Sequence, residues 1–96
     1  MKRVFPVALT DAGDVDGTLR AVLADVLGLP QDQVRSFDQA TPLFGALPEF
    51  DSMAVAGLLT ELEERLGILI EDDEVDADLL ETYGSLLTFA KAKALR

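Results

Sequence analysis

The chain has 96 residues, enough for one domain, and 49% of them are hydrophobic, so it can bury a small core. It contains no Cys and no His, which excludes disulfides, thiolate metal sites and a Ser-His-Asp or Cys-dependent catalytic centre. The formal net charge of −10 repels nucleic acid and anionic membranes and attracts basic partners. No apolar run approaches the ~18–20 residues that span a bilayer, so we expect no membrane insertion and a cytoplasmic location. We also expect a monomer with no catalytic residue and no metal site of its own.

The N-terminal part divides into an extension and the first helix. Residues 1–13 are expected to form an extension that could pack on the domain or stay mobile, and residues 14–96 form the domain. Apolar residues recur at helical spacing between Asp14 and Leu27, which predicts a helix over 14–27. Gly28 and Pro30 favour its end at that point.

A long connection follows, over residues 29–50. It holds three prolines and one glycine, which disfavour a regular helix. Because a structureless stretch of this length is unusual in a compact domain, we expect its apolar residues to anchor it to the core. These anchors are Val34, Phe37, Leu43, Phe44, Leu47 and Phe50.

The second helix is predicted over residues 52–66, with Asp51 or Ser52 as its N-cap and Gly67 at its end. It has the clearest helical periodicity in the chain, given by Val55, Leu58, Leu59, Leu62 and Leu66. Its other side carries Glu61, Glu64 and Arg65, with Glu63 at the flank. Between Phe37 and Ala90 the chain has 13 acids and one base, so this region is the expected docking surface for a basic partner.

The last third is predicted to be helical after a short break. Residues 68–70 form an apolar segment that we expect to be extended and to plug the core, and an acidic run covers residues 71–74. A short helix is expected over 76–81, and a last helix should begin near Gly84 with Ser85 as its N-cap. The predicted fold is therefore an all-α four-helix bundle, with three long helices, one short helix and a long loop between the first two helices.

The residues that favour a specific chemistry are Asp51 and Ser52. A Ser at the start of a helix places its hydroxyl where backbone N–H groups lack partners, and a phosphate ester there would lie at the positive end of the helix dipole. Asp51 would repel that phosphate unless a divalent cation held by a partner enzyme bridged the two. Taken alone, an Asp-Ser pair before a helix is an ordinary cap.

The wider sequence resembles the acyl carrier protein family. That family has Asp-Ser-Leu, an amphipathic helix ending in Leu-Glu-Glu, a turn, an apolar segment and an acidic run, which correspond here to residues 51–74. The resemblance covers about residues 14–95 and includes residues 22–29 and 85–89. It implies that a phosphopantetheinyl transferase attaches 4′-phosphopantetheine from coenzyme A to Ser52. The thiol of this arm would hold acyl groups as thioesters, in chemistry of the fatty acid or polyketide type.

The resemblance also implies roles for further residues. Enzymes that load and transfer acyl groups would dock basic patches on Glu61, Glu63 and Glu64, with Met53 in the contact and Asp51 beside the arm. The residues that would shelter an acyl chain are Met53, Leu59, Leu62, Ile70 and Leu79. The same five residues equally suit an ordinary hydrophobic core.

Three positions depart from the family pattern. Phe50 stands where a small residue is usual, Met53 replaces Leu, and Gly57 stands where many carriers have an acidic docking residue. The last departure argues against the usual fatty-acid synthase partners. The segment is most similar to freestanding carriers associated with exosortase and exopolysaccharide genes.

Three alternatives remain open at this point. The chain could carry aminoacyl or peptidyl groups, although the Gly-Gly-His/Asp-Ser context typical of such carriers is absent. It could also be an acidic helical adaptor without a prosthetic group. An EF-hand beginning at Asp72 is excluded because Ala77 and Tyr83 occupy the positions that require Gly and Glu. The third alternative that remains open is weak surface binding of a cation by the acidic run.

Overall fold

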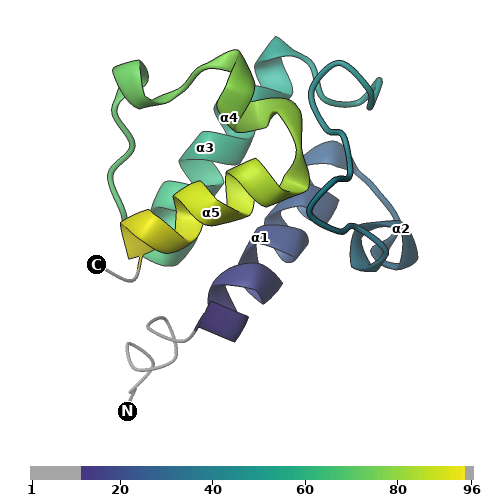
Figure 1. Ribbon diagram of the computed structural model, residues 1–96, viewed down its shortest axis with the longest axis horizontal. Helices are drawn as coiled ribbons and strands as arrows, with labels where there is room; N and C mark the ends of the chain where they lie inside the picture. Colours follow the sequence, from purple (N-terminus) through teal and green to yellow (C-terminus); the bar gives the residue numbers. More distant parts are fainter. Residues whose placement is uncertain (1–11, 95–96) are drawn as a thin grey trace.

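The computed structural model describes residues 12–94, and within this range the chain forms five α-helices and one 3-10 helix (Figure 1). The elements are α1 (Ala12–Leu27), α2 (Gln31–Arg35), α3 (Ser52–Leu66), the 3-10 helix η2 (Asp72–Glu74), α4 (Ala77–Glu81) and α5 (Tyr83–Ala94). The all-α prediction is confirmed, with a fifth helix because α2 forms inside the long connection. None of the helices in residues 12–94 has the length and apolar character needed to cross a membrane.

The first helix begins slightly earlier than predicted. α1 starts at Ala12, inside the region assigned to the N-terminal extension, and ends at Leu27 as expected. Residues 1–11 lie outside the described part of the chain, so the extension stays a prediction.

The core lies between α1, α3 and α5, which pack around one another (Figure 1). The apolar faces of α1 and α3 both point into this core. Each face forms because residues three and four positions apart lie on the same side of a helix. Its fully buried members include Val15, Leu19, Val22, Leu23, Leu43, Leu58, Leu62, Leu86 and Tyr83.

The connection over residues 28–51 is packed against the domain as predicted. Val34, Phe37, Leu43 and Phe50 are buried, whereas Phe44 is 41% exposed and therefore anchors the connection less than expected. Four backbone hydrogen bonds also join the connection to the α4–α5 junction. They run from Leu43 N to Glu81 O (2.8 Å), Phe44 N to Leu80 O (3.0 Å), Tyr83 N to Thr41 O (2.9 Å) and Gly84 N to Gln39 O (3.1 Å).

The predicted bounds of α3 are confirmed at both ends. Asp51 is the N-cap, because its Oδ1 accepts a hydrogen bond of 2.9 Å from the Ala54 N–H. Gly67 ends the helix with a φ of 64°, a left-handed conformation that glycine adopts without steric cost.

The last helix begins one residue before the predicted Gly84, but Ser85 was wrong as its N-cap. α5 begins at Tyr83, and the residue before it, Thr82, takes the capping position. The Thr82 Oγ1 accepts a hydrogen bond of 3.1 Å from the Ser85 N–H, and the Ser85 Oγ accepts one of 3.3 Å from the Thr82 N–H. Ser85 is thus the inner partner of a reciprocal cap rather than the N-cap.

The apolar segment after α3 only partly fills the core. Ile68 and Ile70 are half-buried against it, as expected, but Leu69 is 68% exposed. The cause is the extended backbone, in which successive side chains point to opposite sides.

Candidate functional site

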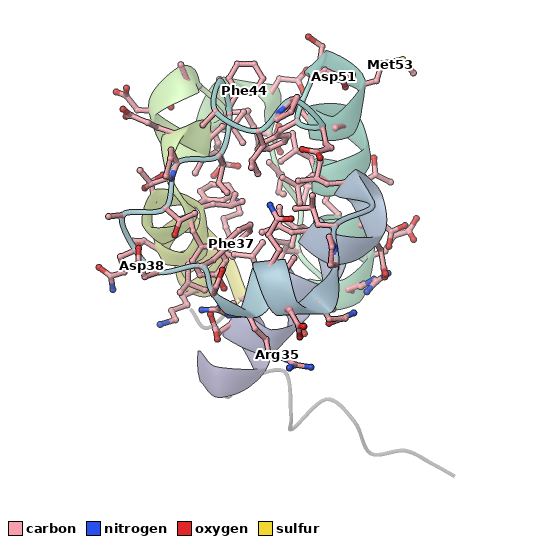
Figure 2. All side chains as sticks on the ribbon, turned by 90° about the vertical axis from the view of Figure 1, so that its right-hand side faces the viewer. Arg35, Phe37, Asp38, Phe44, Asp51 and Met53 are labelled. Atoms are coloured by element: carbon pink, nitrogen blue, oxygen red, sulfur yellow. The ribbon has the colours of Figure 1, made fainter. Side chains whose placement is uncertain are left out.

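The hydroxyl of Ser52 lies at the exposed start of α3. Ser52 is the first helical residue and is exposed, as are Asp51 and Met53 on either side of it. Figure 2 shows Asp51, Met53 and Phe44 at one end of the molecule, opposite the end at which Arg35 lies. Any second protein can therefore approach Ser52 directly.

The start of α3 is held in place by Phe50, one of the three residues that depart from the family pattern. Phe50 is 3% exposed, and its ring lies edge-on to that of Phe44 with 5.7 Å between the centroids. Its backbone N–H donates a hydrogen bond of 3.0 Å to the Leu47 carbonyl. Phe50 thus anchors the end of the connection in the core while the next residues turn outward.

The local backbone is suited to a phosphate ester on Ser52. The N–H groups of Ser52 and Met53 have no hydrogen-bond partner within residues 12–94, because the first N–H groups of a helix have no carbonyl to reach. Asp51 is turned to cap the Ala54 N–H, so one carboxylate oxygen points along the helix end. Together with the dipole of this 15-residue helix, the unpaired N–H groups favour a negative group at this point.

The acidic residues predicted to dock partners differ in the contacts that their carboxylates already make within the domain. Glu61 is paired with Arg65 at 2.9 Å, and Arg65 also reaches Asp25 of α1 at 2.8 Å. The Glu63 carboxylate accepts a hydrogen bond of 2.8 Å from the Ile70 N–H. Glu64 is exposed, and its side chain forms no hydrogen bond or ion pair with residues 12–94.

The five residues predicted to shelter an acyl chain do not share one cavity. Met53 is 84% exposed, and Leu62 and Leu79 lie in the core. Leu59 and Ile70 line an open groove of about 270 Å³ between α3 and the residues that follow it. We call this the α3 groove, and its lining comprises Ala56, Leu59, Thr60, Glu63, Ile70, Asp72 and Val75.

The groove continues the side of α3 on which Ser52 stands. Ala56 follows Ser52 by four residues, and Thr60 and Glu63 follow by eight and eleven, which are spacings that share one helix face. From Ser52 to Glu63 the helix rises about 16 Å. Four lining residues were not predicted as site residues, namely Ala56, Thr60, Asp72 and Val75, although the spacing from Ser52 could have indicated the first two.

Two comparisons relate this chain to known proteins. The model of a family described as "Phosphopantetheine attachment site" matches residues 17–91. A solved structure of a holo acyl carrier protein from Nitrosomonas europaea is 37% identical and superimposes with a TM-score of 0.72, over 81% of this chain and 92% of that one. A search of curated proteins returned no significant match.

Proposed function

Because this chain belongs to the acyl carrier protein family and carries covalently attached 4′-phosphopantetheine, we propose that Ser52 is the residue that bears the arm. The observation that supports this is the exposed hydroxyl at the first position of α3, beside two unpaired backbone N–H groups. The carrier role is that of a protein on which transferases and biosynthetic enzymes act, rather than of a catalyst.

The residues of this chain contribute to the attachment by positioning the Ser52 hydroxyl and by the electric field at the start of α3. The Ser52 Oγ would lose its proton to a base of the transferase and bond to the phosphorus of coenzyme A that carries the pantetheine. The bond from that phosphorus to the bridging pyrophosphate oxygen would break, and 3′,5′-adenosine bisphosphate would leave with that oxygen. Asp51 is adjacent, and its carboxylate suits a Mg²⁺ ion supplied by the phosphopantetheinyl transferase. Once bound, the arm supplies a thiol that holds acyl groups as thioesters.

Partner enzymes with basic patches are proposed to dock on the exposed part of α3. Glu64 offers a charge that is paired with no residue in the described part of the chain, and Met53 offers an 84% exposed apolar side chain next to the arm. Glu61 contributes less to docking because it is already paired with Arg65. Glu63 contributes less because it already accepts a hydrogen bond from the Ile70 N–H. This arrangement fits an interface with an apolar centre and a charged rim.

The α3 groove is the proposed shelter for the acyl chain. It starts one helical turn from Ser52, and Leu59, Ile70 and Val75 give it apolar walls. An arm attached to Ser52 can fold back along the same face of α3 and place its cargo there.

The attachment site is tested by intact-mass analysis after incubation with coenzyme A, Mg²⁺ and a broad-specificity phosphopantetheinyl transferase. We expect the unmodified chain to gain the mass of one arm and Ser52→Ala to gain none. Ser36→Ala is the matched control, because Ser36 is exposed and its hydroxyl donates to the Gln33 carbonyl within its own turn. Modification that persists in Ser52→Ala would disprove this site.

A further inference from the structure

Phe44 is one of three large apolar side chains that are exposed in the described part of the chain, together with Met53 and Leu69. Phe44 and Met53 lie at the same end of the molecule, with Asp51 between them in the view of Figure 2. Because Ser52 directly follows Asp51, two exposed apolar side chains flank the proposed attachment serine. We call these two side chains the Phe44–Met53 patch.

The fold holds the Phe44 ring at the surface by fixing its backbone. The preceding residue, Leu43, is fully buried, and its N–H donates to the Glu81 carbonyl at 2.8 Å. The Phe44 N–H donates to the Leu80 carbonyl at 3.0 Å, and its ring packs against that of Phe50 with 5.7 Å between the centroids. Since backbone and ring are already ordered, little conformational entropy is left to lose when a partner covers the exposed part.

The exposure of Phe44 distinguishes it from the other aromatic residues of the connection. Phe37 and Phe50 are 6% and 3% exposed and serve as anchors in the core, whereas Phe44 leaves 41% of its surface in water. A single exposed apolar residue is common on protein surfaces. Two of them beside the same reactive hydroxyl form a contiguous contact site that a partner can dehydrate with a gain in free energy.

The surroundings of the patch are acidic. Glu49 and Asp51 are exposed at the end of the connection, and Glu81 is exposed at the end of α4, to which the connection is hydrogen-bonded. The segments that form this surface, 41–53 and 77–81, contain no Lys or Arg. The complementary surface on a partner is therefore an apolar recess with Lys or Arg at its rim.

We propose that Phe44 is a docking anchor for the phosphopantetheinyl transferase, which covers it with such a recess while it acts on Ser52. An enzyme that acts on the thiol at the far end of the arm need not approach Ser52 closely, but the transferase must bring its phosphorus within bonding distance of the Ser52 oxygen. A standard interface covers about 800 Å² of each partner, far more than one serine, so it extends over the residues around it. This inference rests on the proposed attachment to Ser52, and it adds the connection to the docking surface on α3.

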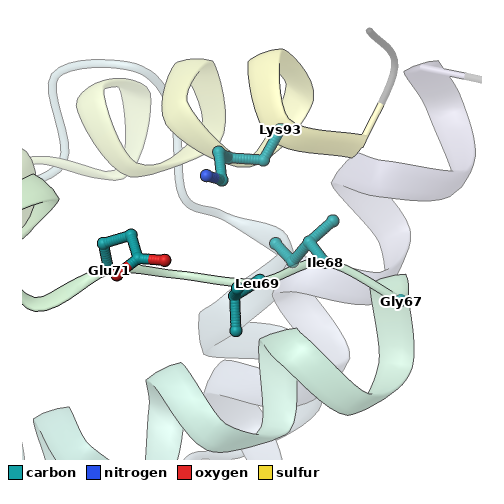
Figure 3. A pocket seen from close by; sticks show the side chains of 5 residues that line it. All are labelled: Gly67, Ile68, Leu69, Glu71 and Lys93. Carbon is teal, nitrogen blue, oxygen red and sulfur yellow. The ribbon is translucent and has the colours of Figure 1, made fainter.

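The first test compares the loading kinetics of full-length variants with coenzyme A, Mg²⁺ and the broad-specificity transferase. Phe44→Ala removes the ring and Phe44→Tyr keeps it. Leu69→Ala is the control, because it removes a 68% exposed apolar side chain that follows the other end of α3 and borders an open hollow beside Lys93 (Figure 3). Hydrogen exchange of the Ala54 amide, which is bonded to Asp51, reports whether the start of α3 stays ordered.

The second test detects the contact itself. Ser52→Ala chains, which take up no arm at this position, carry photoreactive p-benzoylphenylalanine in place of either Phe44 or Leu69. Each chain is irradiated together with the transferase and coenzyme A. Because the cross-link forms only between groups in contact, position 44 should give a covalent product with the transferase and position 69 should give little.

For Phe44→Ala we expect a KM for the carrier about five- to tenfold higher, with kcat and the Ala54 exchange rate unchanged, since the ring contributes to binding alone. Phe44→Tyr and Leu69→Ala should load within about twofold of the unmodified chain. An unchanged KM, a loss of loading accompanied by faster Ala54 exchange, or equal cross-linking from positions 44 and 69 would overturn the docking role.

Two further outcomes are assigned in advance. If Phe44→Ala does not fold, the cross-linking comparison alone decides whether the transferase covers position 44. If no chain takes up an arm, or if Ser52→Ala is still modified, the proposed attachment fails separately. The cross-link from position 44 then still shows whether the transferase docks on this patch.

Discussion

The hydroxyl of Tyr83 in α5 donates a hydrogen bond to the carboxylate of Asp16 in α1. Arg20 completes the group, because its Nε lies 3.1 Å from both Asp16 oxygens and its guanidinium carbon lies 4.6 Å from the centroid of the Tyr83 ring. Its Nη1 also donates to the Val34 carbonyl of α2 at 2.8 Å. These side chains join the first, second and last helices at one place.

Tyr83→Phe is expected to lower the free energy of unfolding by about 1 kcal/mol, the usual loss when a half-buried carboxylate loses a hydrogen-bond donor. The ring itself stays packed against Phe37, whose centroid lies 5.9 Å away. Urea unfolding of the two proteins measures the difference. A midpoint equal to that of the unmodified chain would show that the hydroxyl contributes nothing to stability.

Stability should fall in acid partly through Asp16. Partial burial opposes its ionisation, but the hydrogen bonds from Tyr83 and Arg20 and the charges of Arg20 and Lys91 outweigh that effect and lower the pKa of Asp16 below its ordinary 3.8. The unfolded chain then binds the proton more tightly, so this contribution is present above that ordinary value and is lost as the pH falls through the lower folded pKa.

Asp16→Asn should therefore flatten the dependence of unfolding free energy on pH below about pH 5. Asp73→Asn removes the same charge at an exposed residue of η2 and serves as the control. Urea unfolding repeated from pH 6 to pH 3 gives both slopes. Parallel slopes for Asp16→Asn and the unmodified chain would contradict the role assigned to this carboxylate.

Gly84 is expected to tolerate no side chain. A Cβ there would lie 2.7 Å from the backbone oxygen of Gln39, at the point where the long connection is bonded to the α4–α5 junction. Because backbone must move to relieve this overlap, Gly84→Ala should cost about 1–3 kcal/mol. Gly57→Ala is the contrast: its Cβ would lie 3.5 Å from Val26, an ordinary contact, and the better helix former should stabilise α3 by about 0.5–1 kcal/mol. Thermal unfolding of both variants tests the opposite signs.

Substitutions of Glu63 and Glu64, which are neighbours in α3, should distinguish an effect on docking from an effect on stability. Glu64→Ala is expected to reduce the kcat/KM for loading by the transferase a few-fold, with the effect disappearing at high salt, and to leave stability within about 0.5 kcal/mol. Glu63→Ala should cost about 1 kcal/mol, because the Ile70 N–H loses its partner. If Glu64→Ala loads as fast as the unmodified chain at low salt, the docking role of Glu64 is wrong.

The elements with strong local signals could be predicted from the sequence. The apolar period of α3, the Asp51 cap and Gly67 all favour the same bounds, and the structure has those bounds. α2 was missed because a five-residue helix is too short to show a period. The N-cap of α5 was misassigned because Thr82 and Ser85 can each cap a helix. The choice between them depends on the long connection, to which the Tyr83 and Gly84 N–H groups are bonded.

The site was predictable in part. The place of Ser52 follows from the cap and from the resemblance, but the state of the acids beside it does not. Glu61 and Glu63 have the same charge and neighbouring positions, yet one meets Arg65 and the other meets the Ile70 backbone. Such pairings depend on residues that only the tertiary fold brings together, and so does the place of Lys93 beside Glu74.

The hydrogen bonds between the long connection and the α4–α5 junction have a consequence for biosynthesis of the holo protein. They tie residues 39–44 of the connection that leads to α3 to residues 80–84, so a nascent or truncated chain that lacks the C-terminal helices loses the bonds that fix this connection. We expect a transferase to find an ordered serine only on a chain that has finished folding. Attachment of the arm would then favour completely folded copies over incomplete ones.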